Sequence, residues 1–419
     1  MIRKAKKLIK HCFPNGYKAI RKVYHRSRSV LWDLRLLRLP PLHTLYRPYF
    51  DLGVSAEAKT IWPGSSGEIG DPRKEKLILR CFNSITFENS FKPGFNFDPE
   101  SETLFGIHPA AEEMLRFVKE HHLKMRMHVL VWHNQNDPAF FCRDFHCVYL
   151  DDEQPDPECL VSREELLHRM RSYIYGLVEY IYANGYADCI SGWDVVNEAL
   201  SDNNNEFFRN SLWFRIVGPE YIYHAFLFTR EAVSLYAEQY RHLYSGVKVH
   251  QFLFYNDYNE WFPEKQEKII RLLRDTILNP DHEIQSPVIR PDGNGTLLSD
   301  GLVDGIGMQG HVDTVLDIGQ YISSMRVYSD LTGLVHVTEL DMMNNAYPDT
   351  EKPALVYKEL FKAFIKAVQE GIRLGSVTIW GLTDDRSWRK EKLASLLFDA
   401  QSRPKKEFYA VAEAVKDAQ

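Results

Sequence analysis

Features typical of membrane-spanning and secreted proteins are missing from this sequence. No apolar run approaches the roughly 18–20 residues that a membrane-spanning helix needs. The basic start, MIRKAKKLIKHCFPNGYKAIRK, is followed by no apolar segment and no small-residue cleavage site, so it does not resemble a secretory signal. Cysteine is scarce, with six in 419 residues. We therefore expect a cytoplasmic protein whose thiols are reduced.

Recognisable metal-binding patterns are also missing. Cys142, Cys147 and Cys159 lie near one another along the chain, but their spacing fits no common zinc pattern and no fourth ligand is evident. We expect these cysteines to be ordinary thiols, and the sequence predicts neither a metal nor a cofactor.

Basic residues outnumber acidic ones only at the start of the chain, where the first 40 residues hold 12 Lys and Arg but only one acid, Asp33. The whole chain carries 51 Lys and Arg against 57 Asp and Glu, so the rest is acidic and a poor candidate for nucleic-acid binding. Apolar spacing in residues 29–39 indicates a basic amphipathic helix, which could lie on a membrane surface or contact a protein partner. A helix packed on the folded domain, or a disordered tail, is the favoured interpretation.

The rest of the chain has the composition of a soluble globular protein, with 44% hydrophobic and 26% charged residues. Amphipathic stretches, including residues 110–122, 163–185 and 352–371, separate a series of apolar β-type runs. The runs cover residues 49–55, 77–88, 124–132, 189–199, 249–259, 303–312, 334–342 and 375–384. Eight strands alternating with helices predict an α/β fold, a (β/α)₈ TIM barrel, with a doubly wound open sheet as the alternative. Residues 281–301 are expected to form a long loop.

Polar residues follow nearly every predicted strand. The segments are TFENSFK, VWHNQ, VNEA, YNDYN, MQGHV, TELD and WGLTDD. Any one of them could simply meet solvent or cap the next helix. In a (β/α)₈ barrel, however, the carboxyl ends of all strands converge on one face, where active sites lie. The shared pattern therefore predicts a single polar cleft.

Several of these strand ends carry a glutamate, among them Glu198 after GWDVVN and Glu339 after LVHVT. These two follow the fourth and seventh predicted strands, so their side chains can face each other across the mouth of a barrel. Two facing carboxyl groups are what glycoside hydrolysis requires, one to donate a proton and one to attack the anomeric carbon.

Together these motifs closely resemble glycoside hydrolase family 10, the endo-1,4-β-xylanases. WDVVNEA, VTELD, GIGMQGH, WHNQ, TFENSFK, NDYN and WGLTDDRSW occur in the family's order between about residues 45 and 415. The resemblance implies a catalytic barrel over residues 41–419, preceded by a basic extension, residues 1–40, of unknown role. It also implies hydrolysis of β-1,4-xylan or xylo-oligosaccharides with retention of configuration.

The resemblance implies specific roles for individual residues. Glu198 would be the general acid/base and Glu339 the nucleophile, with supporting roles for Asn197, His311, Asp341 and Asp194. Asn197 would contact the 2-hydroxyl of the reacting sugar, and His311, oriented by Asp341, would contact Glu339. Strand alternation suggests that Asp194 points into the barrel near the acid. The substrate-binding set would be Glu88, Asn89, Lys92, His133, Gln135, Asn256, Tyr258, Gln309, Trp380 and Trp388.

One position departs from the family pattern. Phe140 stands near a place where family members often carry Trp, which puts one stacking contact in doubt. Two alternatives to a xylanase stay open: the same machinery directed at another β-1,4-glycan such as glucan, and a catalytically silent carbohydrate-binding barrel. The presence of both glutamates with their supporting residues disfavours the silent barrel.

Overall fold

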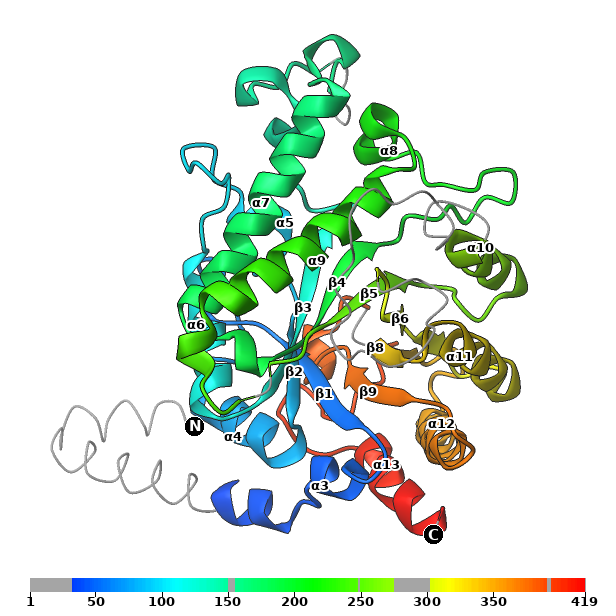
Figure 1. The fold of residues 1–419 in the computed structure, drawn as a ribbon. Coiled ribbons are helices and arrows are strands. Elements are labelled where there is room, and N and C mark those ends of the chain that lie inside the picture. The colour runs from blue at the N-terminus through cyan, green and yellow to red at the C-terminus, as the bar shows by residue number, and fades with distance from the viewer. Residues whose placement is uncertain (1–31, 150–154, 248, 275–301, 390–392, 419) are drawn as a thin grey trace, which may run out of the picture.

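A closed parallel barrel forms the centre of the molecule, and helices surround it (Figure 1). The computed structural model describes residues 32–149, 155–247, 249–274, 302–389 and 393–418. The predicted loop at 281–301 and most of the basic extension therefore lie outside the described residues. Within them, no helix has the length and apolar character needed to cross a membrane.

The strands follow the chain around the barrel with all pairings parallel. They are β1 (Asp51–Ala56), β2 (Ser84–Phe87), β3 (Lys124–Val131), β4 (Ile190–Asn197), β5 (Phe252–Asp257), β6 (Gly305–Met308), β7 (His311–Asp313), β8 (Val335–Met343) and β9 (Leu374–Ile379). Strands β1 to β6 pair in sequence, β1 also pairs with β9, and β9 pairs with β8. Pairing of β6 with β8 closes the ring, while the short β7 continues beyond β6 and pairs with β8. The predicted TIM barrel is confirmed.

Helices lie in the connections between the strands, before β1 and after β9. They are α3 (Leu42–Tyr46), α4 (Pro72–Cys81), α5 (Pro93–Asn96), α6 (Pro109–Glu120), α7 (Arg163–Ala183), α8 (Leu212–Val217), α9 (Tyr221–Gln239), α10 (Pro263–Arg274), α11 (Ile318–Thr332), α12 (Glu351–Gln369) and α13 (Lys406–Asp417). Several begin with a side-chain cap: Ser162 accepts from the Glu165 amide at the start of α7, for example. The predicted helices at 110–122, 163–185 and 352–371 are confirmed as α6, α7 and α12.

The second predicted strand was wrong in its first half. Residues 77–81 belong to α4, which begins at Pro72 behind the capping side chain of Asp71, and β2 starts only at Ser84. The run Leu77–Ile78–Leu79 is apolar because the inner face of α4 is buried, and a short apolar run cannot distinguish a buried helix from a strand.

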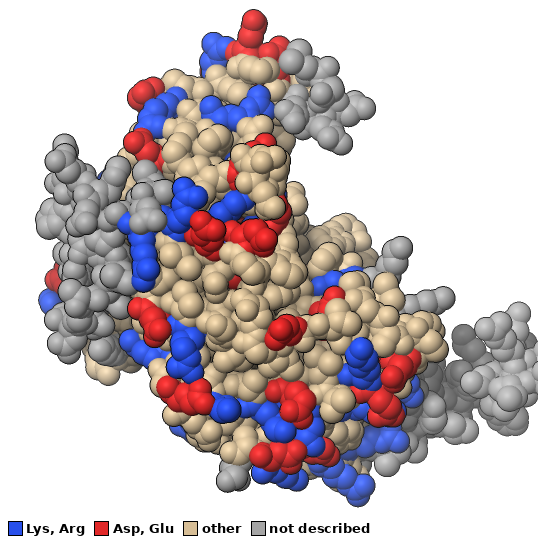
Figure 2. Space-filling view, turned by 90° about the vertical axis from the view of Figure 1, so that its right-hand side faces the viewer, with Lys and Arg blue, Asp and Glu red and all other residues tan. Residues whose placement is uncertain are grey.

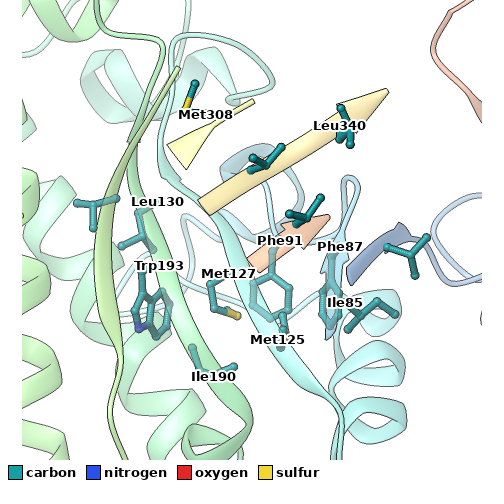
Figure 3. Packing of buried hydrophobic residues seen from close by; sticks show 14 of the residues in the cluster. Ile85, Phe87, Phe91, Met125, Met127, Leu130, Ile190, Trp193, Met308 and Leu340 are labelled. Atoms are coloured by element: carbon teal, nitrogen blue, oxygen red, sulfur yellow. The ribbon is translucent and has the colours of Figure 1, made fainter. Parts of the chain in front are cut away.

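Apolar side chains from neighbouring strands fill the core (Figure 3). Ile85 and Phe87 of β2 lie in one buried cluster with Met125 and Met127 of β3 and with Trp193 of β4. Burial of this kind is the main stabilising contribution to the fold and holds the strand ends in a fixed relation. Basic and acidic side chains are interspersed on the face shown in Figure 2.

The chain ends of the described region pack against each other and against α4. The Tyr46 hydroxyl of α3 donates to the Val411 carbonyl of α13 at 2.6 Å. Arg80 of α4 donates to the Leu39 carbonyl, and Lys76 pairs with Asp33. Residues 33–39 therefore pack on the barrel domain.

The expectation of reduced thiols needs a correction. Cys142 and Cys147 form a disulfide in the connection between β3 and α7, and Cys81, Cys159 and Cys189 are free. The turn at 143–145 brings the two cysteines, which are five positions apart, within disulfide range, a local geometry that spacing alone does not reveal.

Candidate active site

Two glutamates come from β4 and β8, and Glu339 lies beyond the residues of β8 that pair with β6. Glu198 directly follows β4, and Glu339 lies within β8 with only 5% of its surface exposed. Glu198 has a positive φ of 55°, a conformation that non-glycine residues adopt at a cost. Its amide donates to the Asn256 carbonyl and its carbonyl accepts from Arg209 Nε, both at 2.9 Å. These two bonds hold the strained turn that aims the Glu198 side chain.

Three amide side chains connect the two carboxyl groups. Asn256 Nδ2 donates to Glu339 Oε1 and to Asn197 Oδ1, each at 2.9 Å. Gln309 Nε2 donates to Glu198 Oε1 at 2.9 Å and to Asn197 Oδ1 at 3.1 Å. The ends of β4, β5, β6 and β8 thus contribute to one hydrogen-bonded group with a carboxyl at each end.

Cationic groups surround Glu339. His311 Nε2 lies 3.3 Å from Glu339 Oε2, and His311 Nδ1 lies 2.9 Å from Asp341 Oδ1. Burial would lower the pKa of His311, but the charges and hydrogen bonds of Asp341 and Glu339 outweigh it and raise the pKa to about 10. Burial would likewise raise the pKa of Glu339, but the nearby His128 and the hydrogen bond and charge of His311 hold it below its usual value. Glu339 is therefore ionised at neutral pH.

Mostly neutral groups surround Glu198. Trp132 Nε1 donates to Glu198 Oε2 at 3.0 Å, alongside the bond from Gln309. His133 Nδ1 stands 3.8 Å from Glu198 Oε2, and burial lowers the pKa of His133 to about 4, so this imidazole is neutral. Burial raises the pKa of Glu198, the two hydrogen bonds lower it only in part, and the charges of Asp257 and Glu339 raise it further.

The two carboxyl groups are thus biased toward different protonation states in one site. An ionised carboxylate can attack an electrophilic carbon, and a carboxyl group with a raised pKa can deliver a proton. Among the described residues, no group of three or more His, Cys, Asp or Glu side chains is arranged to hold a metal ion. The chemistry that this arrangement supports is acid/base and nucleophilic.

Asp194 on β4 is buried and fully paired. It is 1% exposed, forms an ion pair with Arg126, and lies 3.0 Å from His128 Nδ1. Its charge raises the pKa of Glu339. The register of β4 against β5 shifts between Asp194 and Val196, so the alternation is interrupted before Glu198, and a supporting role for Asp194 beside the acid stays a prediction.

A second polar group lies at the ends of β2 and β3. Lys92 Nζ donates to Asn89 Oδ1 at 3.2 Å and to Gln135 Oε1 at 2.6 Å, and Gln135 Nε2 donates to Asn89 Oδ1. The Lys92 ammonium stands 5.0 Å from the centre of the Trp132 ring, which ties this group to Glu198. Burial raises the pKa of Glu88 to about 7, although the Arg386 guanidinium beside it acts in the other direction.

The aromatic candidates differ in exposure. Trp388 is 61% exposed and Trp380 is 7% exposed, with the Trp380 ring edge-on to His128. The Tyr258 hydroxyl bonds to Asp202 and accepts from Arg209 Nη2 at 2.9 Å. Phe140 is buried against Trp213 and Phe97, so it offers no open face to a sugar.

Sequence reasoning missed four residues that contact this site. They are Trp132, His128, Arg209 and Arg389. Trp132 directly follows β3 and His128 lies within it, in an apolar run after which only His133 and Gln135 were singled out. Arg389 comes one residue after the WGLTDDRSW segment, but its contact with Asp341 depends on how the loop folds back. The polar strand end VWHNQ could have indicated Trp132, whereas His128 carries no such signal.

The model of glycosyl hydrolase family 10 matches residues 42–414. The chain belongs to this family. It is 32% identical over 390 residues to endo-1,4-beta-xylanase A of Thermotoga maritima, covering 89% of this chain but only 30% of that protein. It is 30% identical to endo-1,4-beta-xylanase A of Caldicellulosiruptor saccharolyticus, covering 92% and 99% of the two chains. The crystal structure of TsXylA, an intracellular xylanase from Thermoanaerobacterium saccharolyticum, superimposes with a TM-score of 0.70 at 29% identity, covering 89% of this chain and 98% of the other.

The chain covers different shares of its relatives' lengths. It spans 30% of the T. maritima protein and 53% of the length of endo-1,4-beta-xylanase B of Butyrivibrio fibrisolvens. The matched part is the barrel that carries the two glutamates. Membership of a glycosyl hydrolase family agrees with the acid/base and nucleophilic chemistry of the site.

Proposed function

We propose that this protein is a retaining endo-1,4-β-xylanase. The observation that supports it best is the pair of glutamates with opposite electrostatic surroundings, linked through Asn197, Asn256 and Gln309. The family match and the xylanases among its relatives supply the substrate class.

In the first step, Glu339 attacks the anomeric carbon while Glu198 protonates the departing glycosidic oxygen. The bond between these two atoms breaks, and a covalent glycosyl-enzyme forms with Glu339. Its carboxylate charge is then lost, which lowers the pKa of Glu198, because a negative neighbour has disappeared. Glu198, now ionised, takes a proton from water, the water oxygen attacks the anomeric carbon, and Glu339 leaves with its electrons. Two inversions give net retention.

The polar group at β2 and β3 is proposed to bind the sugars on the nonreducing side of the cleaved bond. Asn89, Lys92 and Gln135 already hold one another, so little side-chain freedom is lost when a sugar hydroxyl replaces one of these contacts. The exposed Trp388 offers an apolar face on which a pyranose ring can lie. Asn197, with its Nδ2 3.3 Å from Glu198 Oε1, is proposed to contact the 2-hydroxyl of the reacting sugar.

Hydrolysis of xylohexaose beside cellohexaose tests this function. The anomer of the first product is followed by NMR before mutarotation. We expect the xylose series to be cleaved internally, with the β-anomer formed first. Release of the α-anomer would overturn the retaining mechanism, and preferential cleavage of the cellulose series would overturn the substrate assignment. Lack of hydrolysis in both series would leave a carbohydrate-binding barrel.

Two further expectations extend this proposal. We propose that residues 41–419 form the catalytic unit and that the reaction takes place in the cytoplasm, as the description of TsXylA as intracellular suggests for that relative. Activity in the soluble fraction of lysed cells, absent from the medium, is the expected result. A contact of residues 1–40 with a membrane surface or a protein partner stays a prediction, because residues 1–31 lie outside the described part of the chain.

A further inference from the structure

Arg389 lies beside the candidate nucleophile without touching it. It follows Trp388 in the loop after β9, and only 12% of its side chain is exposed. Its Nε and Nη2 atoms lie 3.1 and 3.0 Å from Asp341 Oδ1. A guanidinium buried on a carboxylate that is itself 1% exposed makes a much stronger interaction than a surface ion pair.

Asp341 is a junction between three donors. His311 Nδ1 and Arg389 share its Oδ1 atom, while Trp388 Nε1 donates to Oδ2 at 2.6 Å. His311 in turn contacts Glu339. One carboxylate therefore joins the imidazole that stabilises the candidate nucleophile to the exposed indole of Trp388. The Arg389 guanidinium also lies 4.8 Å from the centre of the Trp388 ring.

The four groups Glu339, Asp341, His311 and Arg389 form a cluster whose two negative charges are balanced only when Arg389 is included. Glu339 and Asp341 are ionised, and His311 and Arg389 are positive. Burial would raise the pKa of Asp341, but His311 and Arg389 hold it below its usual range. The other groups that face Glu339 are His128 on β3, Asp194 on β4 and Lys92 after β2. Loss of Arg389 would leave one unbalanced negative charge, which disfavours the ionised form of Glu339.

We propose that Arg389 is a positioning residue that acts on Glu339 through Asp341 and His311, and that fixes the orientation of Trp388. This inference rests on the proposed function for its activity test, but its structural consequence can be measured without substrate. Arg389 and His311 also line one cavity of about 480 Å³, together with Asn259 and Phe262. The Arg389 guanidinium therefore contacts this cavity on one side and the Asp341–His311 pair on the other.

The test compares Arg389→Met, Arg389→Lys and the wild-type enzyme on xylohexaose between pH 4 and 9. We expect Arg389→Met to lower kcat about tenfold and to move the acidic limb of the kcat/KM profile upward by about half a pH unit. Arg389→Lys should restore most of the acidic limb, because it keeps the charge. It should restore kcat only in part, because an ammonium cannot reproduce the guanidinium contact with both Asp341 and the Trp388 ring.

Arg386→Met is the matched comparison. Arg386 lies in the same loop and is 15% exposed, but it contacts Ser66, Glu68 and Glu88 rather than Asp341. If Arg389 merely fastened the loop, both methionine variants would give the same pH profile. We expect Arg386→Met to leave the acidic limb in place, because the group it affects is Glu88, whose pKa of about 7 would rise further and change only the neutral part of the profile. An unchanged acidic limb in Arg389→Met, or an equal shift in both variants, would overturn the proposal.

The chain has 8 tryptophans, so the indole N–H signals in ¹⁵N-labelled protein can be assigned, with Trp388→Phe identifying Trp388. Its indole N–H donates to Asp341 and should follow the titration of the cluster. We expect the midpoint pH of the change in the Trp388 N–H signal to rise in Arg389→Met. In Arg389→Lys it should return to the wild-type value. Failure of the wild-type enzyme to hydrolyse xylohexaose would end the proposed function alone, and the NMR titration would then decide the role of Arg389. A midpoint unaffected by Arg389→Met contradicts it.

Discussion

The β4 and β8 ends of the barrel each present a glutamate to the same cleft, but with different neighbours. At the β4 end, Glu198 accepts hydrogen bonds from the neutral Trp132 and Gln309. At the β8 end, Glu339 contacts His311, whose pKa is raised to about 10. Burial acts in the same direction on both carboxyl groups. The difference between them therefore comes from the nearby charges: His128 and His311 lower the pKa of Glu339, whereas Asp257 and Glu339 raise the pKa of Glu198.

This difference separates the two roles without any difference in residue type. Neutral donors satisfy the hydrogen-bonding capacity of Glu198 but only partly offset burial, so its pKa stays raised. The nearby His128 and the hydrogen bond and charge of His311 more than offset burial at Glu339. Nearby charges, rather than depth in the protein, thus decide which protonation state each carboxyl group favours. Changes at the two ends should consequently have separable effects.

The largest effect is expected from removing the carboxylate at the β8 end. Glu339→Ala should lower kcat on every substrate at least about 10⁴-fold, because no leaving group can compensate for a missing nucleophile. Steady-state hydrolysis of xylohexaose and of an aryl β-xylobioside measures the loss. Unchanged thermal unfolding serves as the control for folding. Residual activity that depends strongly on the leaving group would contradict the assignment.

Removing the carboxyl group at the β4 end should give a selective defect. Glu198→Ala should lower kcat on xylohexaose about 10²- to 10⁴-fold, since the departing sugar needs a proton. Dinitrophenyl β-xylobioside, whose leaving group needs none, should lose far less activity in the glycosylation step. Stopped-flow measurement of the dinitrophenolate burst isolates that step. An equal loss of burst rate and of xylohexaose turnover would rule out the role given to Glu198.

Much of this comparison follows from sequence, because a parallel barrel brings the carboxyl ends of all its strands to one face. Glu198 and Glu339 could be paired on that basis, whereas the bonds of Asn256 and Gln309 to the two glutamates were not predicted, and their contacts with a sugar stay a prediction. The helix at Leu77–Cys81 could not be separated from a strand, since both bury a short apolar run. The register shift in β4 between Asp194 and Val196 leaves no clear sequence signal.

Contacts made by loops were the least predictable. Arg389 meets Asp341 only because the loop after β9 folds back over β8, and Trp132 meets Glu198 only because β3 and β4 lie side by side. The Cys142–Cys147 disulfide likewise depends on a local turn. Each of these contacts is decided by tertiary structure, whereas the strand-end glutamates are decided by topology.

His311→Asn should make the β8 end resemble the β4 end. The substitution replaces a cationic donor to Glu339 with a neutral one, so the ionised carboxylate is less favoured and the pKa of Glu339 rises. The acidic limb of the kcat/KM profile should therefore move upward by about one pH unit, with kcat lowered roughly 30-fold. Profiles on an aryl β-xylobioside from pH 4 to 9 measure both. A stationary acidic limb would show that His311 does not control the ionisation of Glu339.

Trp132→Phe changes the surroundings of Glu198 at the β4 end, and we expect the smallest effect from it. The indole N–H donates to Glu198 Oε2 and favours the ionised carboxylate, so its removal raises the pKa of Glu198 further. The basic limb of the kcat/KM profile should move upward by a few tenths of a pH unit, while the acidic limb stays in place. Loss of the indole should also weaken the contact with Lys92 and raise KM a few-fold. Phe140→Leu, which changes a buried aromatic without a bond to either glutamate, is the control for repacking. A downward shift of the basic limb would mean that the Trp132 bond stabilises the protonated form of Glu198. The raised pKa of Glu198 would then come from hydrogen bonding as well as from burial.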